Sequence, residues 1–244
     1  MNKKHLLAIN VYDKYDWVDA WVKQFEKLDK DKWKLQIVCN GPNPKRGWVI
    51  AGNNDQTSGY KQTLAATVVD EDIDVVVSVH AKTALSDIRH LDALVDILNN
   101  TDEADAMFSE RELYNYKIST PVGDRILLGH PAGEYLFLFL VKAKCWNALI
   151  KEFASDMSIG TEVGMAQSID KLQLNVIRSP CFGPNISMTS GERALFGINM
   201  QLNAYGCERT HSNMNNFEVW SFFGMTPFYN ELRIKDVTNW FNGV

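Results

Sequence analysis

Asp74-Val-Val-Val-Ser-Val-His80 is the stretch with the clearest strand signal in the chain, and valine fills four of its seven positions. β-branched side chains favour a strand, and apolar residues at adjacent positions place apolar side chains on both of its faces. Such a strand is typical of the middle of a parallel sheet that has helices on both sides. We therefore predict that residues 74–80 form a central strand and that His80 lies at its carboxyl end.

Segments with strand-like and helix-like patterns alternate on both sides of this stretch. The other predicted strands are residues 5–12, 33–39, 48–51, 105–109, 135–141 and 174–177. The predicted helices, which carry apolar residues at helical spacing or contain good helix formers, are residues 16–28, 59–69, 86–98, 143–153 and 160–172. This alternation predicts an α/β fold with a mostly parallel central sheet, flanked by helices and joined by right-handed connections.

Two regions depart from the alternation. Residues 114–133 contain several glycines and prolines and no helical period, so we expect a hairpin and an active-site loop there. The pattern weakens from about residue 179, where the only predicted element is a helix near residues 193–202. A chain of 244 residues can still close around one core, so we expect a single domain over residues 1–244 with an irregular C-terminal part.

Charge and cysteine usage exclude some classes of function. The net charge is -5 and the sequence pI is about 5.6, so no overall positive field favours nucleic-acid binding. The four cysteines are far apart and form no Cys-x-x-Cys pair, which is poor spacing for a structural zinc site. The chain also lacks the Gly-x-Ser-x-Gly, P-loop and Gly-x-Gly-x-x-Gly motifs.

Apolar runs in the chain are short. The first, residues 6–9, is too short for the core of a signal peptide, and the longest later run, residues 135–141, is far below membrane-spanning length. We therefore expect no membrane span and a cytoplasmic location.

Four segments, taken in order, resemble the pattern of GT-A glycosyltransferases, the nucleotide-diphospho-sugar transferase superfamily. They are residues 8–13 (Ala-Ile-Asn-Val-Tyr-Asp), residues 37–41 (Ile-Val-Cys-Asn-Gly), residues 54–65 leading into 75–83, and residues 133–139 followed by Thr161-Glu162. The resemblance covers about residues 5–178. It implies a single GT-A-like (Rossmann-like) domain that binds a nucleotide-sugar donor.

The resemblance implies that Asn10, Tyr12 and Asn40, at the ends of the first two strands, hold the nucleoside. General physics agrees, because ligands of open α/β sheets bind outside the carboxyl ends of the strands where the chain switches faces. The alternative is that Asn10 and Asn40 only stabilise turns.

Most members of the family carry an Asp-x-Asp motif for a divalent metal at the end of the fourth strand, and this chain has His80-Ala81-Lys82 there. A hard cation prefers carboxylate oxygens, so the resemblance here implies no obligatory metal cofactor. Lys82 and His80 would face the diphosphate instead, with Lys82 stabilising the charge on the leaving group. Alternatively, Lys82 is a solvated loop lysine, and a backbone carbonyl satisfies His80.

Gly59 and Lys61, at a predicted helix start, are further candidates for contact with the substrate. Lys61 also fits a surface charge. Glu162, at the start of a predicted helix, occupies the place where many inverting relatives carry a general base. Glu134, beside the proposed acceptor loop, is the second carboxylate candidate. The alternative for Glu162 is that it only stabilises the helix N-terminus.

The resulting hypothesis is transfer of a sugar from a nucleotide-diphosphate donor to a hydroxyl acceptor, with inversion and without an obligatory metal. The acceptor is unknown and could be a glycan, a lipid, a protein or a modified nucleic-acid base. Two alternatives stay open. One is a non-catalytic domain of the same fold that binds a nucleotide or glycan, and the other is a nucleotidyltransferase, although the first loop lacks the glycines typical of that group.

Overall fold

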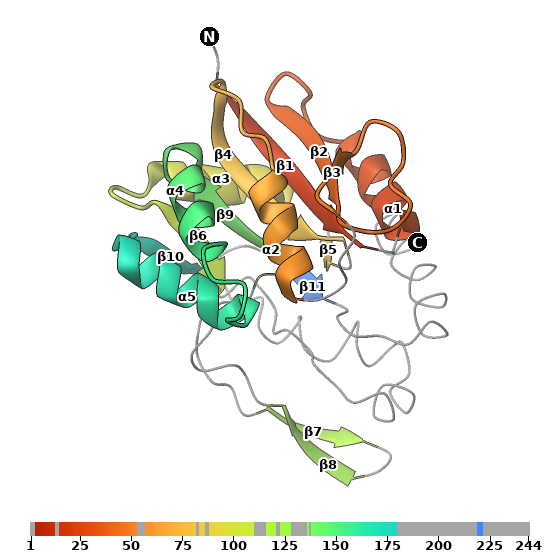
Figure 1. Ribbon diagram of the computed structural model, residues 1–244, viewed down its shortest axis with the longest axis vertical. Coiled ribbons are helices and arrows are strands. Elements are labelled where there is room, and N and C mark those ends of the chain that lie inside the picture. The colour runs from red at the N-terminus through yellow and green to blue at the C-terminus, as the bar shows by residue number, and fades with distance from the viewer. Residues whose placement is uncertain are drawn as a thin grey trace.

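The computed structural model of the chain describes residues 3–12, 15–52, 57–81, 83–85, 88–109, 116–120, 123–127, 136, 138–179 and 219–221. At its centre is a seven-stranded sheet with the order β10-β6-β9-β4-β1-β2-β3 (Figure 1). The strands are β1 (Lys4–Val11), β2 (Trp33–Cys39), β3 (Val49–Ile50), β4 (Ile73–His80), β6 (Ala106–Ser109), β9 (Leu138–Lys142) and β10 (Val176–Ser179). The valine-rich strand β4 is the middle strand, which confirms the prediction for residues 74–80.

The sheet is mostly parallel, as the alternating pattern predicts. β1 pairs in parallel with β2 and β4, β2 with β3, and β10 with β6. β9 is the exception, because it runs antiparallel to both of its neighbours, β4 and β6. The four apolar residues from Leu138 to Val141 are all buried, as a strand between two others with helices on both faces requires.

Helices cover both faces of the sheet (Figure 1). Side chains of α1 (Tyr15–Phe25) and α3 (His90–Asn100) form one core cluster with Leu7 and Ile9 of β1. The helices α2 (Thr57–Ala66), α4 (Ala143–Phe153) and α5 (Thr161–Leu172) form the other with Leu6 and Ala8. Since strand side chains alternate between faces, Asn10 belongs to the α2, α4 and α5 face of the sheet.

Two small sheets lie outside the main one. The hairpin of β7 (Tyr116–Thr120) and β8 (Gly123–Leu127) is separate from the central sheet and lies in the region where the sequence predicts a hairpin (Figure 1). The short strand β5 (Thr83–Leu85) pairs with β11 (Val219–Ser221). A segment near the C-terminus therefore returns to the stretch that follows β4. The helix expected near residues 193–202 lies outside the described residues.

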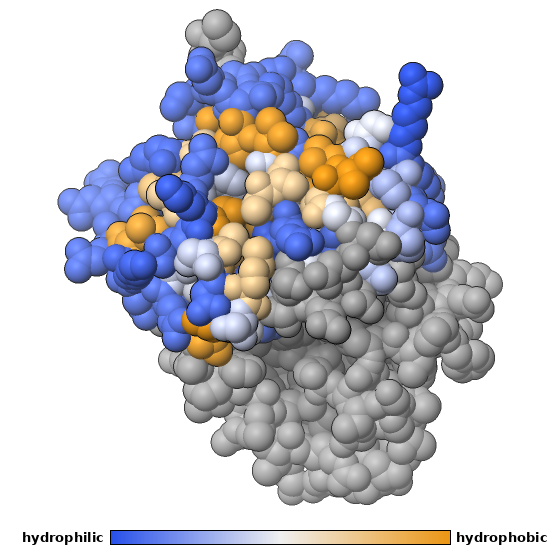
Figure 2. Space-filling view, viewed as in Figure 1, coloured by the Kyte–Doolittle hydropathy of each residue, from blue (hydrophilic) through white to orange (hydrophobic). Residues whose placement is uncertain are grey.

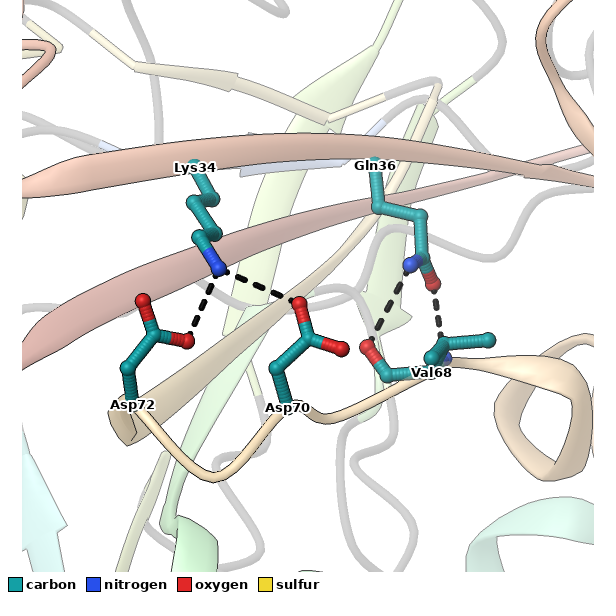
Figure 3. Close-up of polar contacts among 5 residues, drawn as sticks. All are labelled: Lys34, Gln36, Val68, Asp70 and Asp72. Carbon is teal, nitrogen blue, oxygen red and sulfur yellow. Dashed lines mark hydrogen bonds and ion pairs between the residues drawn. The ribbon is translucent and has the colours of Figure 1, made fainter.

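Side chains of β2 fix the connection between α2 and β4 (Figure 3). The Lys34 ammonium lies 3.1 Å from a carboxylate oxygen of Asp70 and 2.8 Å from one of Asp72. The Gln36 amide donates to the carbonyl oxygen of Val68 at 3.3 Å and accepts from its N–H at 2.9 Å. This amide therefore binds Val68 as a neighbouring strand would, and it helps to set the position of α2 on the sheet.

The helices α2, α4 and α5 form the outer layer on the side shown in Figure 2, where hydrophobic residues lie among hydrophilic ones. Ile50 and Val68 are the most exposed of the large hydrophobic side chains described, at 67% and 54%. None of the helices within the described ranges is long and apolar enough to cross a lipid bilayer.

Candidate functional site

The carboxyl ends of β1, β2 and β4 meet at one edge of the sheet. Asn10 pairs in register with His80 of β4, and the Ala81 N–H donates to the Asn10 carbonyl oxygen at 2.8 Å. On the other side of β1, the Asn40 N–H donates to the Val11 carbonyl oxygen at 3.1 Å. The structure thus brings three of the predicted site residues, Asn10, Asn40 and His80, to adjacent strand ends. The fourth, Tyr12, follows β1 directly.

Gly41 draws the ends of β1 and β2 still closer together. A Cβ atom at this position would lie 1.6 Å from the Tyr12 carbonyl oxygen and 2.8 Å from the Tyr15 hydroxyl oxygen. The Gly41 N–H donates to the sulfur of Cys39 at 3.3 Å, and the Asn43 N–H donates to the Tyr15 hydroxyl oxygen at 3.1 Å. Only a residue without a side chain allows the two loops to approach in this way.

The Asn10 side chain is 1% exposed and is held by strand β4. Its Nδ2 donates to the Ser78 hydroxyl oxygen at 2.9 Å and to the Val79 carbonyl oxygen at 3.2 Å. Its Oδ1 is buried and has no hydrogen-bond partner among the described residues. Leaving a buried acceptor unsatisfied costs about 1–3 kcal/mol, so this amide oxygen needs an explanation.

Tyr60 of α2 covers the same strand ends. Its hydroxyl donates to the Leu136 carbonyl oxygen at 2.7 Å. Its ring lies 5.9 Å from the His80 ring, centroid to centroid. Burial raises the pKa of the Tyr60 hydroxyl well above its ordinary value, and the negative charge of Glu162 raises it further, so Tyr60 stays protonated. Tyr60 therefore contacts His80 and lies within the electrostatic reach of Glu162.

Glu162 is in the first turn of α5, where a carboxylate is stabilised by the helix dipole. The Thr161 hydroxyl donates to its Oε2 at 2.7 Å, and the side chain is only partly buried. Because α5 packs in the same core cluster as α2, Glu162 belongs to the α2 side of the sheet, the same side as Asn10 and His80. A half-buried carboxylate can still accept a proton from a bound group.

Lys61 is fully buried, which corrects the alternative that it is a surface charge. Its Nζ donates to the Asp156 carbonyl oxygen, just beyond the C-terminus of α4, and lies 4.9 Å from the centroid of the Phe153 ring. A Cβ atom at Gly164 of α5 would be 3.3 Å from this Nζ. Burial lowers the pKa of the Lys61 ammonium. These contacts join α2 to α4 and α5, and none of them leads to Asn10, Asn40 or His80.

The remaining predicted residues divide into two groups. Gly59 is buried within α2, one residue before Tyr60. Lys82 and Glu134 lie outside the described residues. Within the described ranges, no three His, Cys, Asp or Glu side chains come together as a group that could hold a metal ion.

Sequence reasoning missed Ser78, which accepts from the Asn10 amide, and Tyr60, whose ring contacts His80. Ser78 had a signal, because it is the only polar residue between Asp74 and His80 in a strand otherwise filled with valine. A hydroxyl in the middle of a buried strand needs a hydrogen-bond partner on a neighbouring element. Tyr60 has no such signal, since tyrosine in a helix usually serves the core.

Comparisons with known proteins identify the fold only. No protein-family model matches the chain, and no curated protein matches it. Among solved structures, the apo structure of the bifunctional glycosyltransferase WbbM is 10% identical and covers 100% of this chain with a TM-score of 0.52. This chain spans 51% of that protein. The sheet order and this likeness confirm the GT-A fold.

Two further solved structures have lower TM-scores. The mannosyltransferase PcManGT from Pyrobaculum calidifontis, in complex with GDP-Man and Mn²⁺, is 11% identical over 73% of this chain, with a TM-score of 0.49, and this chain spans 55% of it. The 4-diphosphocytidyl-2C-methyl-D-erythritol synthase from Anaerococcus prevotii is 8% identical over 73% of this chain and 90% of its own, with a TM-score of 0.44.

Proposed function

We propose that the chain transfers a sugar from a nucleotide-diphosphate donor to a hydroxyl acceptor, with the donor bound outside the carboxyl ends of β1, β2 and β4. The observation that carries the proposal is the meeting of Asn10, Asn40 and His80 at adjacent strand ends, with Glu162 on the same side of the sheet. Open α/β sheets bind ligands at this edge. Asn10, Tyr12 and Asn40 would hold the nucleoside.

The proposed chemistry gives a role to each of three side chains, Glu162, Lys82 and His80. The acceptor oxygen would attack the anomeric carbon, and the bond from that carbon to the diphosphate oxygen would break, with inversion. Glu162 would take the proton from the acceptor hydroxyl. Lys82 and His80 would face the diphosphate, and the Lys82 ammonium would stabilise the negative charge that the leaving group gains. A hard cation prefers carboxylate oxygens, and the Lys82 ammonium would repel it. We therefore propose that no metal is obligatory.

Binding of donors tests the proposal first. Calorimetry with UDP-, GDP-, CMP- and dTDP-sugars, each with EDTA and with Mn²⁺, should show binding of at least one donor in the presence of EDTA. Binding that requires Mn²⁺ would contradict the metal-independent reading and leave the donor site standing. Absence of heat with every donor under both conditions would contradict the proposed function itself.

Glu162→Gln separates an enzyme from a binding protein. This variant keeps the shape of the side chain and removes the base, so the donor should still bind while transfer to the acceptor, or hydrolysis by water, falls by about 10²-fold or more. Glu152→Gln is the matched control, because Glu152 lies on the neighbouring helix α4 and pairs with Lys171 at 2.7 Å. A wild-type protein that binds a donor and never turns it over would favour the non-catalytic alternative.

A further inference from the structure

The connection between α4 and α5, residues 154–160, leads directly into the first turn of α5 and is exposed over most of its length. At its start, the N–H and the hydroxyl of Ser155 both donate to the carbonyl oxygen of Glu152 in α4. In its middle, the N–H and the hydroxyl of Ser158 donate to Asp156 Oδ1 at 2.8 and 2.6 Å. These bonds give the connection its local shape and do not attach it to α2 or to the sheet.

Lys61 attaches this connection to α2. Its Nζ donates to the Asp156 carbonyl oxygen, and the side chain is fully buried although its acceptor belongs to an exposed residue. Among the described residues, this is the one hydrogen bond that joins residues 154–160 to an element other than α4 and α5. A hydrogen bond from a charged donor is stronger than one between neutral groups, so it restrains the backbone at Asp156.

The Lys61 ammonium also contacts the first turn of α5. A Cβ atom at Gly164 would lie 3.3 Å from Lys61 Nζ and 3.6 Å from side-chain atoms of both Ile159 and Phe153. Phe153 ends α4, and the centroid of its ring is 4.9 Å from the same Nζ. The ammonium therefore lies where α4 ends and α5 begins, and Gly164, which it contacts, is two residues after Glu162.

A buried ammonium is a costly way to join helices. Burial disfavours the charged form, and an apolar side chain of similar shape often replaces a buried charged group without loss of stability. Packing alone would therefore be served as well by methionine at residue 61. The hydrogen bond to Asp156 is what the lysine adds, and its effect is to fix a backbone position in an exposed connection.

We propose that Lys61 is a positioning residue that holds the Asp156 carbonyl group and the first turn of α5, so that Glu162 is fixed relative to α2 and the strand ends. The inference rests on the proposed function, in which Glu162 is the base, and deepens it. The preceding residue, Tyr60, has its ring 5.9 Å from that of His80, so α2 contacts both the strand ends and the start of α5 (Figure 1). Proton removal depends on the place of the base, so a shift of Glu162 would slow transfer without weakening donor binding.

A double-mutant cycle on turnover tests the positioning role. The assay is hydrolysis of the UDP-, GDP-, CMP- or dTDP-sugar that binds in calorimetry, with water as the acceptor. Lys61→Met should lower kcat about tenfold to hundredfold and leave the Kd of the sugar nucleotide within about twofold, since a displacement of about 1 Å costs that much in rate. In the Glu162→Gln background, Lys61→Met should not lower the residual kcat further. Equal losses in the two backgrounds would overturn the inference.

Lys171→Met is the matched control, because Lys171 joins the same two helices elsewhere. It lies in the last turn of α5 and pairs with Glu152 of α4 at 2.7 Å. Its kcat should stay within about twofold of wild type, since this exposed pair is far along α5 from Glu162. A loss in Lys171→Met equal to that in Lys61→Met would show that any loosening of α4 from α5 slows the reaction, which contradicts a specific role of Lys61.

A ligand-free measurement separates failure of this inference from failure of the proposed function. Backbone hydrogen exchange, followed by mass spectrometry on peptides that cover residues 154–162, should be faster in Lys61→Met than in wild type and Lys171→Met, while peptides from α1 stay unchanged. Unchanged exchange at residues 154–162 would contradict the inference even in an active protein. If wild type turns over no sugar nucleotide, the proposed function fails and the role in turnover fails with it, and exchange alone then decides whether Lys61 holds the connection.

Discussion

The Tyr12 carbonyl oxygen lies where a side chain on residue 41 would begin, 1.6 Å from the position of a Cβ atom on Gly41. The neighbouring Asn40 N–H is bonded to Val11 at 3.1 Å, so the ends of β1 and β2 are locked together at this point. Backbone meets backbone here, and neither side can give way by rotating a side chain. The geometry of the proposed nucleoside site therefore depends on a glycine.

Gly41→Ala should move the Tyr12 and Asn40 loops apart. We expect a loss of about 1–3 kcal/mol in the free energy of unfolding, since overpacking a close contact costs that much, together with loss of nucleotide binding. Urea denaturation and calorimetry measure the two effects. Gly160→Ala is the matched control, because nothing lies within 4 Å of its Cβ position. Wild-type stability in Gly41→Ala would show that the loops can separate freely.

Lys61→Met should change how stability depends on pH. Burial lowers the pKa of Lys61 in the folded protein, so below the ordinary value of 10.5 there is an interval in which the unfolded chain binds more protons. The free energy of unfolding of wild type should therefore rise with pH across this interval, relative to Lys61→Met. Urea denaturation at pH 8, 9 and 10 measures the slopes, with Lys30→Met, at an exposed lysine, as the charge control. Parallel slopes would contradict a buried ammonium.

Lys34→Met should change how the stability of the protein depends on pH in acid. The hydrogen bond from Lys34 lowers the pKa of Asp72 below its ordinary value of 3.8. That contribution to stability is present above pH 3.8 and is lost as the pH falls through the lower, folded value. Thermal unfolding between pH 2 and 6 should therefore show a shallower acid slope in Lys34→Met than in wild type.

The outcome that contradicts this prediction is an identical acid slope in the two proteins. Lys3→Met is a suitable control, because Lys3 pairs with a different aspartate, Asp74, at 3.3 Å. Both pairs are at least partly exposed to solvent, so added salt should reduce the difference between Lys34→Met and wild type.

Cys145 should react slowly with thiol reagents at neutral pH. Burial, together with the Asp105 carboxylate 3.4 Å from its sulfur, raises the pKa of Cys145 to about 11. The thiolate is the reactive form, so iodoacetamide labelling at pH 8, followed on the peptide that contains Cys145, should be much slower than for a free cysteine. Asp105→Asn should accelerate labelling. Rapid labelling of the native wild-type protein would contradict the raised pKa.

Local pattern was enough to predict most of the elements. Residues 33–39 and 143–153 match β2 and α4 at both ends, and the middle position of β4 follows from its valines. Helix starts are less certain, because they depend on capping contacts as well as on periodicity. The helix predicted for residues 86–98 begins at His90 and ends at Asn100, and its N-cap residue, Arg89, makes no side-chain capping bond.

What the sequence by itself determined is the part that depends on near neighbours along the chain, namely strand and helix periodicity and the polar ends of β1, β2 and β4. Tertiary structure alone decided that β9 runs antiparallel and that Lys61 is buried against α4 and α5. It also decided that Ser78 and the Val79 carbonyl oxygen hold the Asn10 amide. The physical reason is that periodicity reports which face of an element is buried, whereas hydrogen-bond partners and strand direction depend on residues tens of positions away that only packing brings into contact.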